Sequence, residues 1–361
     1  MRFRQADHLD TGYFMRLSPR LSPGSRALRL LVTLALILAF IVIFSGVWCP
    51  GIIESYEVLL TTPTPAPTLA PSLPPASPAP TATPKPETFT IIWLSDTQTI
   101  AYNKDDKVFR AMGEWIAAQQ EPLDIRYIVQ TGDLVDNGYM QKQWDSFYLM
   151  SDHFYGKIPY LTIAGNHDLG VKRQDYSAFL ELPFITDLPE EQKFMGGQAV
   201  YAELQAGGVD FLFIGAGWGA DVSSTVWINK VLRAHPDHVA ILLMHSYLTA
   251  ADVLSYQGDE IRDQIVATNP NVRLVLAGHI RGSGYIMEAF DDDGDGTMDR
   301  QVNAMLYNYQ EYPRYGSGQL RILTFDTATR NIHVATYSPY TDRYYADGHF
   351  KEKEFDLVNA F

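Results

Sequence analysis

One stretch of the chain separates a part that can form a globular domain from a part that cannot. Residues 30–48 form a run of 19 residues without a charged side chain. A bilayer core of about 30 Å needs roughly 20 such residues in a helix that rises about 1.5 Å per residue. We therefore predict one transmembrane helix at residues 30–49, so that any large folded domain has to lie after it.

The charges on either side of this run predict its orientation. Six arginines precede it in residues 1–29, whereas no basic residue follows it until Lys85. Because cytoplasmic flanks of membrane spans are rich in Arg and Lys, we expect residues 1–29 in the cytoplasm. The rest of the chain would then be extracytoplasmic, on a single-pass protein of the cell membrane. A cleaved secretory signal is the alternative, and it would export the same domain.

Residues 50–87 have the composition of a linker. Ten of the chain's 21 prolines lie at 61–86, interleaved with Thr, Ala and Ser. Such a sequence favours extended polyproline II structure and cannot bury a core. We interpret 50–87 as an extracytoplasmic linker and 88–361 as the folded domain.

The charge of the chain limits what it can bind. Its formal net charge is −14 at pH 7. An acidic domain repels phosphate backbones, so we expect no nucleic-acid binding. A domain of this charge that acts on phosphate groups needs cations to do so, which favours a metal-dependent site.

After residue 88, apolar strands alternate with segments of helical periodicity. This pattern predicts an α/β fold with mixed sheets. The predicted helices are 104–120, 139–154 and 222–234. The predicted strands are 88–95, 125–130, 158–164, 199–204, 209–215, 239–244 and 272–277, followed by paired strands at 285–290, 302–309, 320–325 and 332–337.

Five of these strands end in side chains that bind metals. They are Asp96, Asp133, Asn166, His245 and His279. Functional groups in α/β sheets gather at the carboxyl ends of the strands, so five such ends can share one cleft. Asp, Asn and His are ligands for manganese, iron, zinc or magnesium. A carboxylate between two such ions gives a pair that clamps a phosphoryl group and generates hydroxide near neutral pH.

The order of these motifs resembles a known family. D-x-[HQ], GD, GNHD, H and GH follow one another over about residues 88–340, as in the calcineurin-like metallophosphoesterase superfamily. LSDTQ, with Gln in place of His, is similar to a bacterial branch of exported members. The resemblance implies two facing mixed β-sheets flanked by helices, a four-layer α-β-β-α sandwich. It also implies a metal-dependent phosphoesterase that cleaves monoesters, diesters or pyrophosphates.

Carried over by position, the resemblance implies two divalent metal ions. Asp96 would bind the first, Asp133 would bridge both, and the second would be held by Asn166, His245 and His279. Gln98 stands where D-x-H has His, and it offers only a carbonyl oxygen. The first site should therefore be the weaker one; on a stricter view, only the second ion binds durably.

Three further residues are candidates for catalysis. The resemblance places His167 near the leaving oxygen as a general acid, with Asp168 orienting its ring. Arg281 stands where the family's G-H-x-H motif has its second His. Arg has only donors and cannot bind a metal, but its guanidinium can hold a substrate phosphate in bidentate fashion.

An acidic loop predicts a possible calcium site. Residues 291–299 fit the first nine positions of a D-x-D-x-D-G-x-x-D calcium loop, with candidate ligands Asp291, Asp293, Asp295 and Asp299. The twelfth position is Val302 instead of the usual Glu. The alternative is a hairpin turn that is simply acidic and exposed.

Two other classes of protein compete with the enzyme. The incomplete first site allows a non-catalytic module that binds metal or phosphate on the same fold. The anchor and linker allow a structural wall protein, which leaves the strand-end residues unexplained. We favour the enzyme, acting on a phosphorylated small molecule or a component of the cell envelope.

Overall fold

The computed structural model describes residues 85–361, except 171–172 and 347–353. Within these residues, no helix has both the length and the apolar character needed to cross a bilayer. The predicted cytoplasmic segment 1–29, the transmembrane helix 30–49 and most of the linker 50–87 lie outside the described residues. Glu87 already belongs to the fold, because its backbone N–H donates to Thr327 Oγ1 at 2.9 Å and its carboxylate accepts from the Gly207 N–H at 2.6 Å.

The first sheet has seven strands in the order β13-β12-β11-β1-β2-β3, with β14 also paired to β12. The three strands β1, β2 and β3 run parallel, whereas β11 is antiparallel to β1. Their bounds are β1 Thr88–Leu94, β2 Ile125–Gln130, β3 Tyr160–Thr162, β11 Leu320–Asp326, β12 Asn331–Ser338, β13 Arg343–Tyr344 and β14 Glu354–Leu357.

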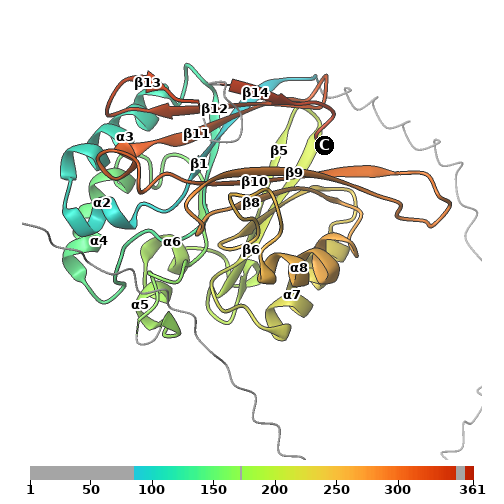
Figure 1. The fold of residues 1–361 in the computed structure, drawn as a ribbon, viewed down its shortest axis with the longest axis horizontal. Coiled ribbons are helices and arrows are strands. Elements are labelled where there is room, and N and C mark those ends of the chain that lie inside the picture. The colour runs from blue at the N-terminus through green and yellow to red at the C-terminus, as the bar shows by residue number, and fades with distance from the viewer. Residues whose placement is uncertain (1–84, 171–172, 347–353) are drawn as a thin grey trace, which may run out of the picture. The chain divides into compact units, whose positions relative to one another are not determined.

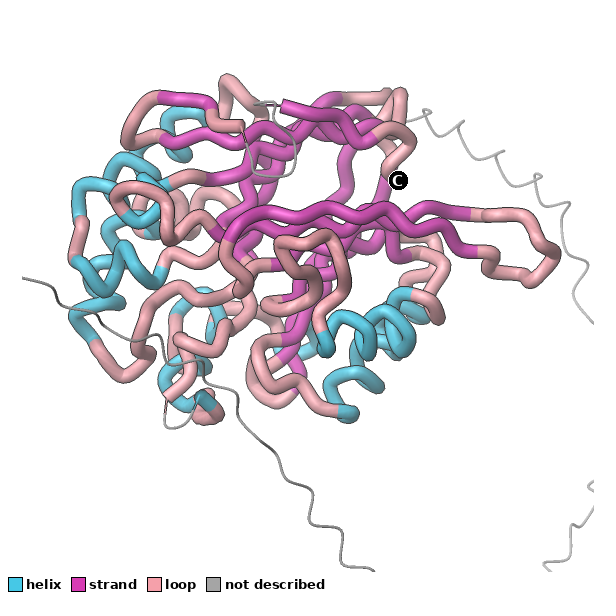
Figure 2. Tube along the Cα trace, in the orientation of Figure 1, coloured by secondary structure: helices cyan, strands magenta, loops and turns pink. Residues whose placement is uncertain are grey.

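The second sheet also has seven strands, in the order β4-β5-β6-β7-β8-β10-β9. Strands β6, β7, β8 and β10 run parallel, and antiparallel partners lie on both sides of them. Their bounds are β4 Lys193–Phe194, β5 Ala199–Ala206, β6 Val209–Ala216, β7 Val239–Met244, β8 Val272–Ala277, β9 Gly282–Phe290 and β10 Arg300–Asn308. Figure 2 shows the β9–β10 hairpin extending beyond the neighbouring strands.

Helices cover the outer face of each sheet (Figure 1). The α-helices are α2 Gln98–Asn103, α3 Asp106–Gln119, α4 Gln141–Ser151, α5 Ser177–Leu180, α6 Pro183–Thr186, α7 Val222–Ala234 and α8 Tyr256–Ile261. A π-helical turn at Arg262–Val266 continues α8, and two short 3-10 helices lie at Glu190–Gln192 and Tyr315–Gly318. Helix α7 begins at Asp221, whose carboxylate accepts a hydrogen bond from the Ser224 N–H at 3.0 Å, as an N-cap should.

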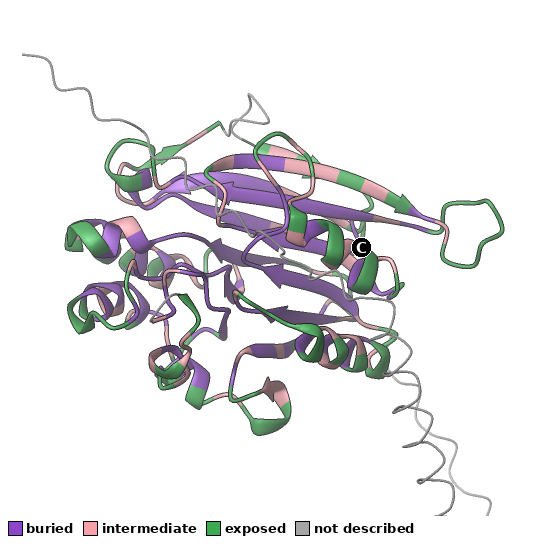
Figure 3. Ribbon diagram, turned by 60° about the horizontal axis from the view of Figure 1, so that its bottom comes forward, coloured by how far each residue is buried: buried purple, intermediate pink, exposed green. Residues whose placement is uncertain are grey.

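Three apolar layers hold the two sheets and their helices together. Alternate residues of β1 point to opposite faces: Phe89, Ile91 and Trp93 pack between the sheets, and Ile92 and Leu94 pack beneath α3 and α4. The strands of the second sheet divide in the same way between the inter-sheet core and the layer under α7. Because these strands are buried on both faces, they read as continuous apolar runs. Figure 3 shows the buried strands between helices with exposed outer faces.

The predicted α/β fold with two mixed sheets flanked by helices is confirmed. The predicted helix at 222–234 and the strands at 239–244 and 272–277 match α7, β7 and β8. The helix predicted at 104–120 is wrong in its start: α3 begins at Asp106, because the separate helix α2 ends at Asn103 and its C-cap Lys104 adopts a left-handed conformation with φ 53°. The short elements α5, α6, β4, β13 and β14 were not predicted.

Candidate metal centre

The five strand-end residues come to one edge of the two sheets. Asp96, Asp133 and Asn166 follow the parallel strands β1, β2 and β3, while His245 and His279 follow β7 and β8. Backbone bonds tie successive ends together, since Asp96 N–H donates to Gly132 O at 3.1 Å and Gly278 N–H donates to His245 O at 3.2 Å. The predicted convergence is therefore what the fold produces.

The glycine before three of these residues is a requirement of close packing. A Cβ on Gly165 would lie 2.2 Å from Asp133 Oδ1, and one on Gly278 would lie 2.3 Å from Asp96 Oδ2. Gly132 has φ +95°, and a Cβ there would lie 2.7 Å from His245 Nδ1. The GD, GN and GH motifs thus reflect the approach of one strand end to another.

Asp133, His245 and His279 form the centre of the site. One ligand atom of each residue lies within 4.8 Å of the others. His245 Nε2 is 3.3 Å from Asp133 Oδ2, and both side chains are almost completely buried. Burial alone would lower the pKa of His245, but the Asp133 carboxylate outweighs it and raises that pKa to about 9. Burial lowers the pKa of His279 to about 4, so His279 is neutral at pH 7 and has a lone pair for a metal.

Two neighbours fix the ring of His245. Its Nδ1 lies 2.7 Å from the carbonyl oxygen of Thr131, which directs the Nδ1 proton there. The Nε2 atom then faces Asp133 and lies 3.2 Å from Asn166 Oδ1. A backbone carbonyl on the far ring nitrogen is how proteins commonly orient a metal-binding His. Asn166 therefore lies beside His245, and its role as a metal ligand stays a prediction.

Asp96 and Gln98 lie beside this centre, and hydrogen bonds already occupy both Asp96 oxygens and the Gln98 amide nitrogen. Both oxygens of Asp96 accept hydrogen bonds: Ser95 Oγ lies 2.5 Å from Oδ2, and Asn308 Nδ2 lies 2.9 Å from Oδ1. Burial raises the pKa of Asp96 to about 7. Gln98 Nε2 donates to Asp133 Oδ2 at 3.1 Å. Asn308 was not among the predicted site residues, yet its amide positions Asp96.

The prediction that Asp168 orients His167 is wrong. His167 Nδ1 lies 3.0 Å from Asp136 Oδ1 and 3.1 Å from the Asp136 carbonyl oxygen. The turn after β3 directs the ring toward the loop that follows β2, where Asp136 is the nearest acceptor. Asp136 is therefore the residue that holds the ring of His167.

Asp168 instead links the loops after β2 and β3. Its side chain is completely buried and accepts hydrogen bonds from the backbone N–H groups of Leu134 at 2.7 Å, Val135 at 3.0 Å and Gly165 at 2.7 Å. Burial raises the pKa of Asp168 to about 8, although the backbone donors oppose this shift. By fixing these backbones, Asp168 positions Asp133, which precedes Leu134, and Asn166, which follows Gly165.

Arg281, the predicted phosphate-binding residue, does not line the cavity beside His167, whereas Arg173 does. The Arg281 side chain is 62% exposed and pairs with Glu311 at 2.9 Å. Arg173 instead lines a cavity of about 450 Å³ together with Asn166, His167 and Asp136. Its charge is one of the influences that lower the pKa of His279. Nothing in the spacing of the sequence marked Arg173, because it lies in an irregular loop.

The acidic loop at 291–299 connects β9 and β10, two strands, as expected. Oxygen atoms of Asp291, Asp293 and Asp299 lie within 4.8 Å of one another. Asp295, the fourth predicted ligand, does not belong to this group and accepts from the Thr297 N–H at 2.7 Å. Asp291 accepts from the N–H groups of Gly294 and Gly296, each at 2.8 Å, as an acidic turn would. Calcium binding stays a prediction.

Comparison with known proteins identifies the family. The family model described as calcineurin-like phosphoesterase matches residues 89–281, more than half of the 361 residues. The chain belongs to this family. Its domain is thus of a class of metal-dependent phosphoester hydrolases, and the resemblance seen in the motifs is confirmed.

One sequence relative and one solved structure are similar to the chain. The chain is 38% identical over 283 residues to the uncharacterized protein YvnB of Bacillus subtilis (strain 168), a match that covers 76% of this chain. The chain spans only 22% of the length of that relative. A purple acid phosphatase, PPD1 from yellow lupin (Lupinus luteus) seeds, has a similar fold, with TM-score 0.51 and 12% identity over 78% of this chain and 55% of that one.

The family implies divalent metals, and the residues present fit them. Asp133, His245 and His279 offer a carboxylate and two imidazoles within reach of one another. Gln98 Oε1 and Asn166 Nδ2 are buried amide atoms without a hydrogen-bond partner among the described residues. A buried polar atom normally has a partner, so the acceptor Gln98 Oε1 fits a cation, and the donor Asn166 Nδ2 fits an oxygen atom of a bound ligand.

Proposed function

We propose that the chain is a phosphohydrolase in which Asp133, Asn166, His245 and His279 hold one divalent ion, at the second site, and Asp96 and Gln98 contribute to the weaker first site. The single observation that carries this proposal is the buried Asp133–His245–His279 cluster at the strand ends. Divalent ions bound there supply an acidified water and neutralise negative charge on phosphoryl oxygens.

The protein's own residues complete the reaction. His167 lies at the edge of the cluster, where its backbone N–H donates to Asp133 Oδ1 at 2.8 Å. Asp136 holds the His167 ring by Nδ1, which leaves Nε2 to donate a proton to the departing alcohol. Arg173, in the same cavity as His167, is suited to hold a nonreacting phosphoryl oxygen.

The test is elemental analysis of the purified full chain, followed by assays on aryl phosphates, bis-aryl phosphates and nucleotide pyrophosphates with the metals found and with manganese. We expect at least one bound ion and hydrolysis of at least one ester class. Bound metal without any hydrolysis would favour the alternative, a binding module on the same fold. That alternative draws support from Asp96, whose oxygens are already hydrogen-bonded.

The two arginines give a matched comparison. Arg173→Ala should lower kcat/KM by about 10- to 100-fold, because a hydrogen bond to a charged group contributes roughly 1.5–3 kcal/mol and each 1.36 kcal/mol is tenfold in rate. Arg281→Ala should stay within about twofold, since its exposed ion pair with Glu311 contributes little. Steady-state kinetics on an aryl phosphate measure both. If Arg281→Ala lowers kcat/KM more than Arg173→Ala does, then Arg281 is the residue that binds the phosphate.

We also propose that the domain is extracytoplasmic and anchored by residues 30–49. The proposal rests on the uncharged run at 30–48, the six arginines before it and the proline-rich residues after it. Protease added to intact cells should then release the folded domain by cutting within 50–87. Protection of the domain under those conditions would contradict the proposal.

A further inference from the structure

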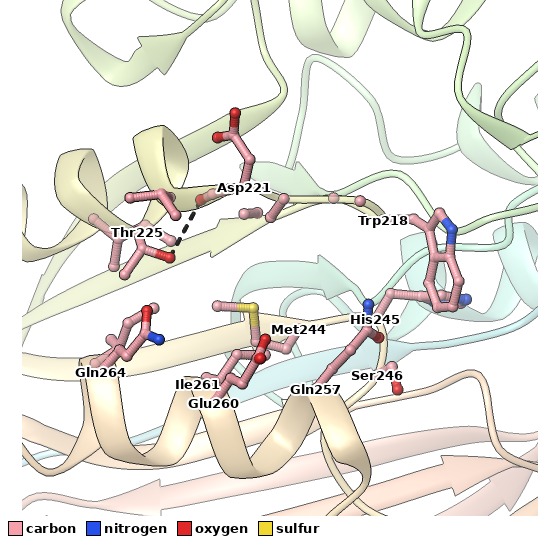
Figure 4. Close-up of a pocket in the computed structure, with 17 residues that line it drawn as sticks. Trp218, Asp221, Thr225, Met244, His245, Ser246, Gln257, Glu260, Ile261 and Gln264 are labelled. Atoms are coloured by element: carbon pink, nitrogen blue, oxygen red, sulfur yellow. Dashed lines mark hydrogen bonds between the residues drawn. The ribbon is translucent and has the colours of Figure 1, made fainter. Parts of the chain in front are cut away.

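A second cavity reaches the metal centre along a different path from that of Arg173. This groove, of about 340 Å³, lies between α7 and α8 and includes Trp218 and His245 in its lining. Figure 4 shows Glu260 and Ile261 of α8 and Gln264 of the π-helical turn on one side, with Thr225 of α7 facing them. Trp218 and His245 lie together at one end of the groove (Figure 4). A substrate bound at the cluster can therefore extend into this space.

Trp218 is held in place between the groove and the ligands. Its ring lies 4.8 Å from the ring of His279 and 5.9 Å from that of His245, measured between centroids. The backbone on either side is fixed, since Trp218 N–H donates to Ala164 O at 2.8 Å and Tyr176 Oη donates to Trp218 O at 2.7 Å. The half-buried indole thus forms a preset aromatic surface next to His245 and His279.

The charge of the groove is negative. Its lining contains two acidic residues, Asp221 and Glu260, and no Lys or Arg. The Asp221 carboxylate caps α7, and Figure 4 draws it pointing away from the groove. Glu260 forms no ion pair with another residue in the described part of the chain. Its exposed carboxylate is therefore the charge that a ligand in the groove meets first.

The remaining lining combines uncharged polar side chains, such as Gln257 and Gln264, with apolar ones. Ile228, Met244, Ile261 and Ile265 line the groove between its charged rim and the sheet. An indole face, apolar walls and one carboxylate attract an alkylammonium group, which interacts with an aromatic face by a cation–π contact worth about 0.5–2 kcal/mol. The same carboxylate repels a substituent that carries a further phosphate or carboxylate.

We propose that this groove binds one alcohol substituent of a phosphodiester, and that Trp218 and Glu260 select an amino or trimethylammonium alcohol there. The proposal rests on the phosphohydrolase function proposed above and adds the substrate class. It places the phosphoryl group at the ligand cluster and the cationic alcohol between α7 and α8. Glu260 acts as a specificity-determining residue, distant from the bond that breaks.

Three p-nitrophenyl phosphodiesters test this, with choline, its uncharged isostere 3,3-dimethylbutanol, or glycolate as the second alcohol. All three release the same p-nitrophenol, so differences in kcat/KM report on the second alcohol alone. We expect the full chain with manganese to prefer the choline ester over the isostere by about tenfold and to act on the glycolate ester most slowly. Glu260→Gln should reduce the choline-to-isostere ratio at least about threefold.

Asp259→Asn is the matched control, because it removes one negative charge from the neighbouring residue of α8, which does not line the groove. It should leave the ratio unchanged. Equal rates for choline and its isostere, or a ratio that Glu260→Gln and Asp259→Asn change alike, would overturn the groove proposal while leaving the phosphohydrolase in place. Failure of all three diesters to react, in a chain that hydrolyses an aryl monophosphate or a nucleotide pyrophosphate, would overturn the groove proposal alone, whereas failure on every ester class would overturn both.

Discussion

Asp133→Asn is expected to lower kcat/KM for an aryl phosphate by about 10³-fold, because the metal's contribution to the transition state is several kcal/mol and each 1.36 kcal/mol is tenfold. Asp133 lies at the middle of the cluster, with Oδ2 near His245 Nε2 and Gln98 Nε2 and with Oδ1 accepting from the His167 N–H. An Asn keeps the shape but has one oxygen and no charge. Elemental analysis should show less bound metal in the variant.

Asp237→Asn is the control for this experiment, since Asp237 is an exposed carboxylate in the turn between α7 and β7. It should retain the activity and metal content of the unaltered chain. If Asp133→Asn binds the same amount of metal and stays within tenfold of the original rate, then Asp133 is not a ligand. Melting temperatures of both variants, measured without added metal, distinguish a lost ligand from a damaged fold.

The sequence predicted long elements better than short ones, for a physical reason. A strand such as β7 is buried on both faces, so its whole length is an uninterrupted apolar run with clear ends. The start of helix α7 is marked in the sequence by its N-cap residue, Asp221. Elements of two to four residues, such as β13 and α6, are too short to show the periodic spacing of apolar residues by which a helix or strand is predicted. Their backbones are set by the partners that they meet in the folded chain.

The residues of the site likewise include some that the sequence predicts and some that it does not. Residues at strand ends could be predicted together because parallel strands bring their carboxyl ends to one edge, whatever the details of the loops. The acceptor that holds the His167 ring could not be predicted from the sequence. The choice between Asp136 and Asp168 depends on how the turns after β2 and β3 direct their side chains. Arg173 and Trp218 lie in irregular segments, where spacing carries no information about position. Arg173 and Trp218 can be recognised as neighbours of the site only from the folded structure, which places them near His167 and His279.

Gly165→Ala should damage both the fold and the metal centre, although it adds a single methyl group. The Cβ would lie 2.2 Å from Asp133 Oδ1 and 2.3 Å from the Asp133 backbone nitrogen. Neither atom can move away easily. The Oδ1 atom accepts a hydrogen bond from the His167 N–H, and the nitrogen belongs to the backbone. We expect the free energy of unfolding to fall by about 3 kcal/mol, at the upper end of the usual range for overpacking, with loss of bound metal.

Gly156→Ala separates steric clash from backbone strain. Gly156 has φ +74° but nothing within 4 Å of the position that a Cβ would take. This variant should lose only about 1–2 kcal/mol, the usual cost of a left-handed conformation in a residue with a side chain, and it should keep its metal. Urea denaturation and elemental analysis measure both variants. Equal losses in the two would mean that the loop before Asn166 yields to the methyl group, so that the GN motif is not a constraint of packing against Asp133.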